Sequence, residues 1–102
     1  MNTNPEFEAD CQALMDRYFA GHPNGDMQKR ANRIVRLLRT SEKPLKGTAE
    51  SWAAGILYYI ASDGRNPVGI PGLLNAECEK LTGVTMETVR RRAAKVSDLA
   101  TF

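Results

Sequence analysis

Hydrophobic side chains recur at intervals of three and four residues near the start of the chain, the spacing that places them on one face of an α-helix. The positions of this first series are Phe7, Cys11, Leu14, Met15 and Tyr18. Gly21 and Pro23 follow and disfavour continuation of the helix. The pattern predicts a first amphipathic helix that ends near Gly21.

The same spacing returns after a short break and predicts a second helix. Its apolar positions are Met27, Ala31, Ile34, Val35 and Leu38. Asp26 is the expected N-cap, and the helix should run to about Thr40, before Pro44 and Gly47. Two amphipathic helices joined by a short loop are expected to pair as a helical hairpin.

A third segment, Trp52–Ala61, is apolar all the way round a helix, so it cannot lie on a surface. With Thr48 as its N-cap, it predicts a central helix over residues 48–63 that the other helices surround. Its ten apolar residues fall well short of the roughly 20 that a membrane-spanning helix needs. We therefore expect no membrane association.

The last third of the chain predicts a helix-turn-helix over residues 73–99. The first of its helices spans Leu73 to Leu81 and buries Leu74, Cys78 and Leu81. Gly83 allows a sharp turn, Val84 is expected to be buried in that turn, and Thr85 is the expected N-cap of a last helix. That last helix buries Val89, Ala93 and Val96.

No segment alternates polar and apolar residues as a strand does, so the expected fold is all-α. About five helices surround the central one in a single domain, 1–102, because 102 residues with 42% hydrophobic side chains bury one modest core. Cys11 and Cys78 stand far apart and His22 is the single histidine, so neither a disulfide framework nor a zinc site is expected. The N-terminus lacks a signal-peptide pattern, which indicates a cytoplasmic protein.

Charge is segregated along the chain although the net charge is only +2. The last helix carries a cationic run that could lie in the major groove of DNA, with its first residues reaching base edges. The predicted DNA-binding residues are Thr85, Met86, Glu87, Thr88, Arg90, Arg91 and Lys95. Arg92 lies nearer the buried side of the helix. The alternative is a solvated helix whose cations favour its C-terminal half.

The second helix offers another basic face, whose predicted role is to contact DNA phosphates. Its residues are Lys29, Arg33 and Arg36. Alternatively this face is only solvated, with its cations paired to Asp10 and Asp16 of the first helix.

From Pro44 onward the chain resembles a cyclin-type helical repeat of the kind found in the core of transcription factor IIB. The matching residues are the loop ending in Gly47, the pair Ala53-Ala54, the run 56–61, residues 77–85 and Thr88-Val89-Arg90. The resemblance implies a helix-turn-helix that contacts promoter DNA through residues 85–91. The chain is also similar to an uncharacterised bacterial family in which Pro44-Leu45-Lys46-Gly47 and Trp52-Ala53-Ala54 have counterparts.

Two departures from the initiation factor change what the resemblance implies. The factor has two repeats and a zinc ribbon, whereas this chain has one repeat, so it is expected to dimerise or to bind DNA weakly. The position four residues before the turn glycine is normally small, so that the two helices cross closely, and here it is Glu79.

Enzymatic activity and a cofactor are not expected, because the sequence has no nucleophile motif and no pair of carboxylates on one buried face. The competing function is a protein-interaction module that binds partner peptides in a groove between helices. Its candidate anchors are aromatic: Tyr18, Phe19, Trp52, Tyr58 and Tyr59. DNA binding requires an exposed basic surface, whereas a groove binder requires an exposed apolar patch.

Overall fold

The computed structural model describes residues 5–39, 47–62 and 75–100, and over these residues all regular secondary structure is α-helical. The helices are α1 (Pro5–Gly21), α2 (Gly25–Arg39), α3 (Ala49–Ser62), α4 (Asn75–Thr82) and α5 (Met86–Ala100). The predicted all-α class is thereby confirmed. None of the described helices is long and apolar enough to cross a membrane.

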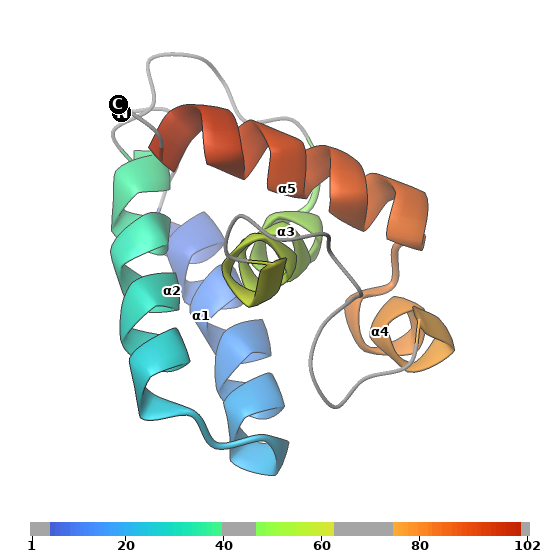
Figure 1. Cartoon of the computed structure of the whole chain (residues 1–102), viewed down its shortest axis with the longest axis horizontal. Coiled ribbons are helices and arrows are strands. Elements are labelled where there is room, and N and C mark those ends of the chain that lie inside the picture. The colour runs from blue at the N-terminus through green and yellow to red at the C-terminus, as the bar shows by residue number, and fades with distance from the viewer. Residues whose placement is uncertain (1–4, 40–46, 63–74, 101–102) are drawn as a thin grey trace.

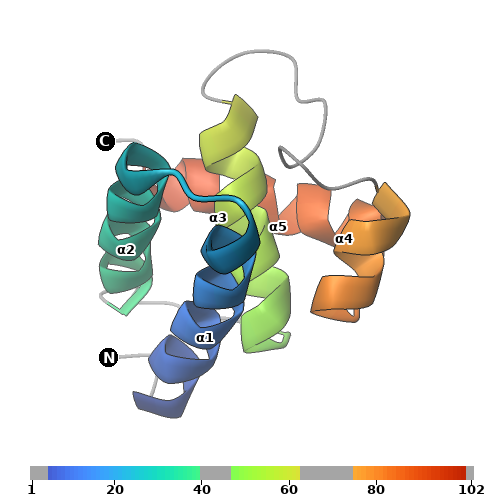
Figure 2. The same ribbon diagram turned by 90° about the horizontal axis from the view of Figure 1, so that it is seen from below.

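The helix α3 lies at the centre and packs against each of the other four (Figures 1 and 2). Its most extensive contact is with α5, which crosses it. The helices α1 and α2 run antiparallel and cover another side of α3, while α4 lies beside the N-terminal end of α5. The prediction of a central helix surrounded by the others is confirmed.

Burial along α3 follows from its apolar sequence. Every residue from Ser51 to Tyr58 is buried, and Ile56 and Leu57 have no exposed surface. Complete burial of such a side chain contributes about 1.5–3 kcal/mol to stability. Thr48 caps the helix as predicted, because its hydroxyl oxygen accepts a hydrogen bond from the Ser51 N–H at 3.2 Å.

Gly55 allows α5 to approach α3 closely. A Cβ atom at this position would lie 2.6 Å from the Cβ of Arg92 and 3.0 Å from the backbone nitrogen of Ala93. Real Cβ atoms essentially never show contacts below 3.0 Å, so any larger residue would force the two helices apart. The position of α5 on the core therefore depends on a glycine in the middle of α3.

The predicted inner faces of α1 and α2 are confirmed. The buried residues are Cys11, Leu14, Met15, Tyr18, Met27, Ala31, Ile34, Val35 and Leu38, and the half-buried Phe7 packs against them. The predicted cap of α2 is wrong: Asn24, not Asp26, precedes the helix, and its side-chain oxygen accepts a hydrogen bond from the Met27 N–H at 3.1 Å. Asp26 lies inside the first turn instead.

The segment from α4 to α5 follows the predicted order of helix, turn and helix. Cys78 is buried as predicted, but Leu81 and Val84 are only half-buried at the edge of the core. Leu81 and Val84 were both expected to be buried, and neither is fully covered; Leu81 lines a cleft instead. Leu73 and Leu74, where the helix was predicted to begin, lie outside the described residues, as does Thr40.

Candidate functional site

The turn between α4 and α5 is built from backbone and hydroxyl hydrogen bonds. Gly83 adopts a φ of +74°, a conformation that favours glycine, and its N–H donates to the carbonyl of Glu79 at 2.8 Å. The Thr82 hydroxyl donates to the Cys78 carbonyl at 2.8 Å and accepts from the Val84 N–H at 3.3 Å. These contacts end α4 and turn the chain sharply towards α5.

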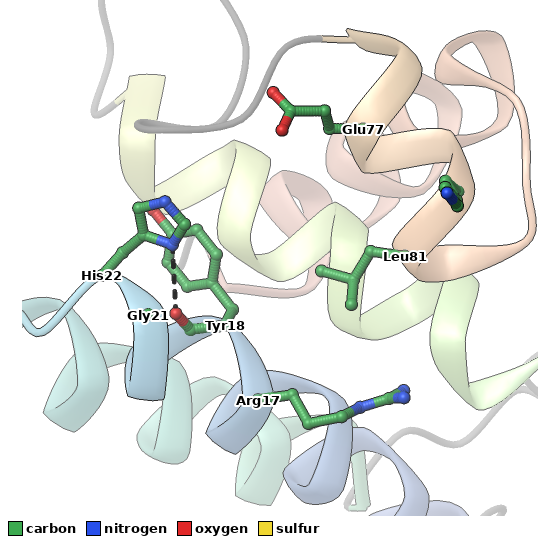
Figure 3. Close-up of a pocket in the computed structure, with 7 residues that line it drawn as sticks. Arg17, Tyr18, Gly21, His22, Glu77 and Leu81 are labelled. Atoms are coloured by element: carbon green, nitrogen blue, oxygen red, sulfur yellow. Dashed lines mark hydrogen bonds between the residues drawn. The ribbon is translucent and has the colours of Figure 1, made fainter.

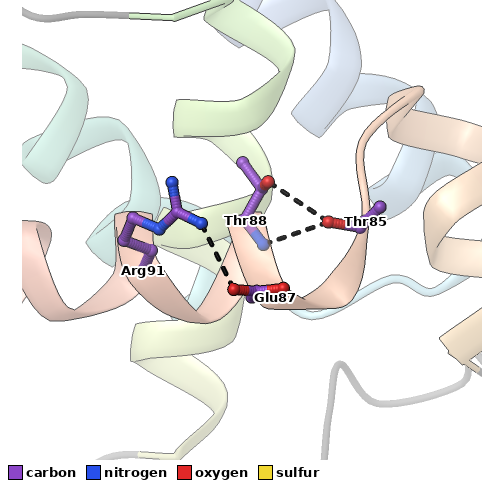
Figure 4. Close-up of polar contacts among 4 residues, drawn as sticks. All are labelled: Thr85, Glu87, Thr88 and Arg91. Carbon is purple, nitrogen blue, oxygen red and sulfur yellow. Dashed lines mark hydrogen bonds and ion pairs between the residues drawn. The ribbon is translucent and has the colours of Figure 1, made fainter.

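Thr85 caps α5 as predicted (Figure 4). Its hydroxyl oxygen accepts a hydrogen bond from the Thr88 N–H at 3.3 Å, and its carbonyl accepts from the Val89 N–H at 3.0 Å. The hydroxyls of Thr85 and Thr88 lie 3.2 Å apart. The first turn of α5 is therefore held by its own polar side chains at the surface.

Glu79 has a structural role that its sequence position did not reveal. Although the residue is exposed, one carboxylate oxygen accepts a hydrogen bond from the Met86 N–H at 2.8 Å. This N–H belongs to the first turn of α5, where the helix dipole favours a negative charge. Glu79 thus joins α4 to the start of α5.

The buried face of α5 differs from the predicted one at a single position. Val89, Ala93 and Val96 are buried as expected, but Met86 is also buried, with 5% of its surface exposed. The prediction that Met86 reaches DNA bases is therefore wrong. The spacing of three between Met86 and Val89 continues the apolar face and was the signal that this residue belongs to the core.

The outward face of α5 brings together most of the predicted DNA-binding residues. Glu87, Arg90, Arg91 and Lys95 are exposed there, Thr85 is exposed at the cap that precedes the helix, and Thr88 is half-buried. An ion pair joins Arg91 to Glu87 at 3.5 Å, with 61% and 81% of the two side chains exposed (Figure 4). Such exposed pairs are weak, so Arg91 can exchange this partner for another anion.

Arg92 has a structural role, in agreement with its predicted place near the buried side. Its guanidinium lies over the Trp52 ring, 5.0 Å from the centroid, and its Nε donates to the Ser51 hydroxyl at 3.3 Å. A Cβ at Gly47, where φ is +98°, would overlap the guanidinium. Burial is the main cause that lowers the pKa of Arg92, and neighbouring Arg91 adds to it.

The second predicted basic surface lies on the outer side of α2. Lys29, Arg33 and Arg36 are exposed there, and Arg30 of the same helix is exposed as well. The helix α2 contacts α5 and meets its C-terminal half (Figure 1). The helix α2 therefore lies towards the opposite end of α5 from Thr85.

The expected pairing of this surface with acidic residues of α1 is not observed. Among the described residues, no ion pair joins Asp10 or Asp16 to the three predicted cations of α2. Asp16 instead accepts a hydrogen bond from the Gln12 side chain at 3.1 Å. Gln12 also donates to Asn32 across the helical pair at 2.9 Å, so this contact between α1 and α2 is made by neutral amides.

The aromatic residues considered as anchors for a partner peptide belong largely to the core. Tyr18, Phe19, Trp52 and Tyr58 are between 3% and 6% exposed, and Tyr59 is half-buried. A peptide could contact the first four only if the core opened. The surface needed by a groove binder is therefore not formed by these residues.

The two cysteines are free and buried. Burial, with added repulsion from Glu50, raises the pKa of the Cys11 thiol from 9.0 to about 12, and the thiol donates to the Ala49 carbonyl at 3.3 Å. Burial likewise raises the pKa of Cys78. Both thiols are therefore unreactive in the folded protein, and no group of three potential metal ligands forms within the described parts of the chain.

No protein-family model, curated protein or solved structure matches this chain. The resemblance to cyclin-type repeats therefore stays a prediction.

Proposed function

We propose that this protein binds DNA by placing the outward face of α5 in the major groove. The observation that carries the proposal is the combination of a tight turn at Gly83, a cap at Thr85 and three exposed cations, Arg90, Arg91 and Lys95, on one helix face. A helix-turn-helix uses these features to present its second helix to DNA. The helix is anchored from behind by α3, so its outward face points away from the core (Figure 1).

The residues on this face divide by the contacts they would make. Thr85 and Glu87, at the N-terminal end, would contact base edges, where a glutamate accepts a hydrogen bond from cytosine and a threonine serves several bases. Arg90, Arg91 and Lys95 would contact guanine or phosphates. The exposed cations of α2 would extend the phosphate contacts past the C-terminal half of α5.

Charge and size limit the affinity of one copy. The outward face of α5 also carries Glu87 and Asp98, which offset part of the positive charge. A single recognition helix covers one half-site, so tight binding to a specific site requires a second copy of the chain or a partner protein. The free thiols of Cys11 and Cys78 fit a reducing cytoplasm.

The experiment is a fluorescence-anisotropy titration of a labelled duplex of mixed sequence at low salt. The wild type should bind with a dissociation constant of roughly 10⁻⁴–10⁻⁶ M, the range of non-specific binding. The variant Arg90→Ala/Arg91→Ala should bind about tenfold more weakly or worse, because charge-assisted contacts are lost. Its matched control, Arg90→Lys/Arg91→Lys, keeps the charge and should retain most of the non-specific affinity.

Two further variants locate the interface. Glu87→Gln removes a negative charge from the same face and should strengthen DNA binding, whereas the affinity would not change if DNA bound at a distant surface. Arg33→Ala/Arg36→Ala tests the α2 surface separately. If only the α2 pair affects binding, the interface is α2 and the role proposed for α5 is wrong.

A further inference from the structure

A cleft separates the C-terminal end of α1 from α4 (Figure 3). Its volume is about 450 Å³, within the range of roughly 300–1,000 Å³ that is typical of small-molecule sites. The helix α4 packs on α3 and α5, so the cleft lies where this short helix faces α1 without close packing. None of the residues assigned to DNA contact lines it.

Cations line both sides of the cleft. Arg17 comes from α1 and Lys80 from α4, and both side chains are exposed. Among the described lining residues one carboxylate, that of Glu77, accompanies them. An anion bound in the cleft would have a positive charge on each side of it. An arginine can bind a carboxylate or phosphate with two hydrogen bonds, and a lysine adds a point charge.

The inner wall of the cleft is aromatic and apolar. The ring of His22 stacks on that of Tyr18, with centroids 4.9 Å apart and an interplanar angle of 17°. The Nδ1 of His22 donates to the Tyr18 carbonyl at 3.2 Å, which fixes the ring in place (Figure 3). Leu81 lies half-buried on the α4 side, and Gly21 keeps the space beside His22 open because it has no side chain.

We propose that this cleft binds a small organic anion with a planar or apolar body. Arg17 and Lys80 would hold its carboxylate or phosphate group, while its body would lie against His22 and Leu81. A ligand held in this way would connect α4 to α1. The proposal concerns a surface separate from α5 and does not depend on DNA binding.

The test uses phenyl phosphate and benzoate as probes and the full chain labelled with ¹⁵N. Backbone amide shifts are followed by NMR at constant ionic strength, with phenol as the uncharged control. We expect saturable shifts centred on Gly21, His22, Lys80 and Leu81 with both anions. Phenol should produce much smaller changes, because it lacks the charged group that Arg17 and Lys80 recognise.

Variants test the assignment of the two cations. Arg17→Ala/Lys80→Ala should weaken binding by about tenfold for each charge removed, whereas Arg90→Ala/Arg91→Ala, with the same loss of charge elsewhere, should keep the shifts in the cleft. If the first variant fails to fold, the single substitutions Arg17→Lys and Arg17→Ala make the same comparison. The proposal is wrong if the anions shift only amide signals of α2 or α5, or if no saturable shift occurs. It is also wrong if phenol produces shifts as large as those of the anions, or if Arg17→Ala/Lys80→Ala binds the anions as tightly as the wild type.

Discussion

Replacement of Gly55 by alanine tests the packing on which the position of α5 depends. Alanine favours helix formation over glycine by about 1 kcal/mol, so on propensity alone Gly55→Ala should stabilise α3. The added Cβ, however, would lie 2.6 Å from the Cβ of Arg92 and 3.0 Å from the backbone nitrogen of Ala93. Backbone atoms cannot move aside by rotation, so the whole of α5 would have to shift.

The expected magnitude follows from these opposing effects. Overpacking a core costs about 1–3 kcal/mol, and contact with backbone places this case at the upper end. After subtraction of the gain in propensity, Gly55→Ala should lower the free energy of unfolding by about 2 kcal/mol. For a chain of this size the melting temperature should then fall by roughly 8–16 °C.

The assay is thermal and urea unfolding followed by circular dichroism, with Gly25→Ala as the matched control. A Cβ at Gly25 meets nothing within 4 Å, so this variant should gain about 0.4–1 kcal/mol. The two substitutions are chemically identical and should shift stability in opposite directions. Equal stabilisation by both would refute the close crossing of α3 and α5.

Three further predictions concern single side chains. Asn24→Ala should destabilise the protein by about 1 kcal/mol and Asp26→Ala by less, as measured by urea unfolding, because Asn24 is the cap of α2. Arg92→Ala should lower the free energy of unfolding by about 1–2 kcal/mol, because the stacking of Arg92 on Trp52 is lost, whereas Arg91→Ala should change it by less than about 0.5 kcal/mol. Equal effects of the two substitutions would contradict the structural role of Arg92. The pKa of the Cys11 thiol is raised in the folded state from 9.0 to about 12. The contribution of the buried thiol to stability is therefore present below pH 9.0 and is lost as the pH rises to about 12. Across this window the free energy of unfolding of the wild type should fall more steeply than that of Cys11→Ala.

The helices could be predicted from the sequence because their apolar spacing is regular. The buried faces of α1 and α2 follow directly from it, and the uniformly apolar run of α3 requires a central position. The N-cap of α2 was harder to predict, because Asn24, Gly25 and Asp26 are all residue types that favour the start of a helix. Only the hydrogen bond to Met27 distinguishes Asn24 from its neighbours.

The candidate site could be predicted only in part. The exposed positions of Arg90, Arg91 and Lys95 follow from helical geometry, but the burial of Met86 depends on how α5 begins. The contact of Glu79 with that first turn joins two helices across seven residues, which no helical period indicates. The cleft between α1 and α4 brings together residues about 60 positions apart in the sequence, so periodicity alone could not reveal it.

The salt dependence of DNA binding tests the central claim most directly. The logarithm of the binding constant should be measured against the logarithm of salt concentration for the wild type and for Arg90→Ala/Arg91→Ala. Each phosphate contact contributes roughly 0.9 to the slope, so the variant should have a slope shallower by about 1–2 if these arginines contact the backbone. Parallel slopes with unchanged affinity, or no binding by the wild type at low salt, would contradict DNA recognition through α5.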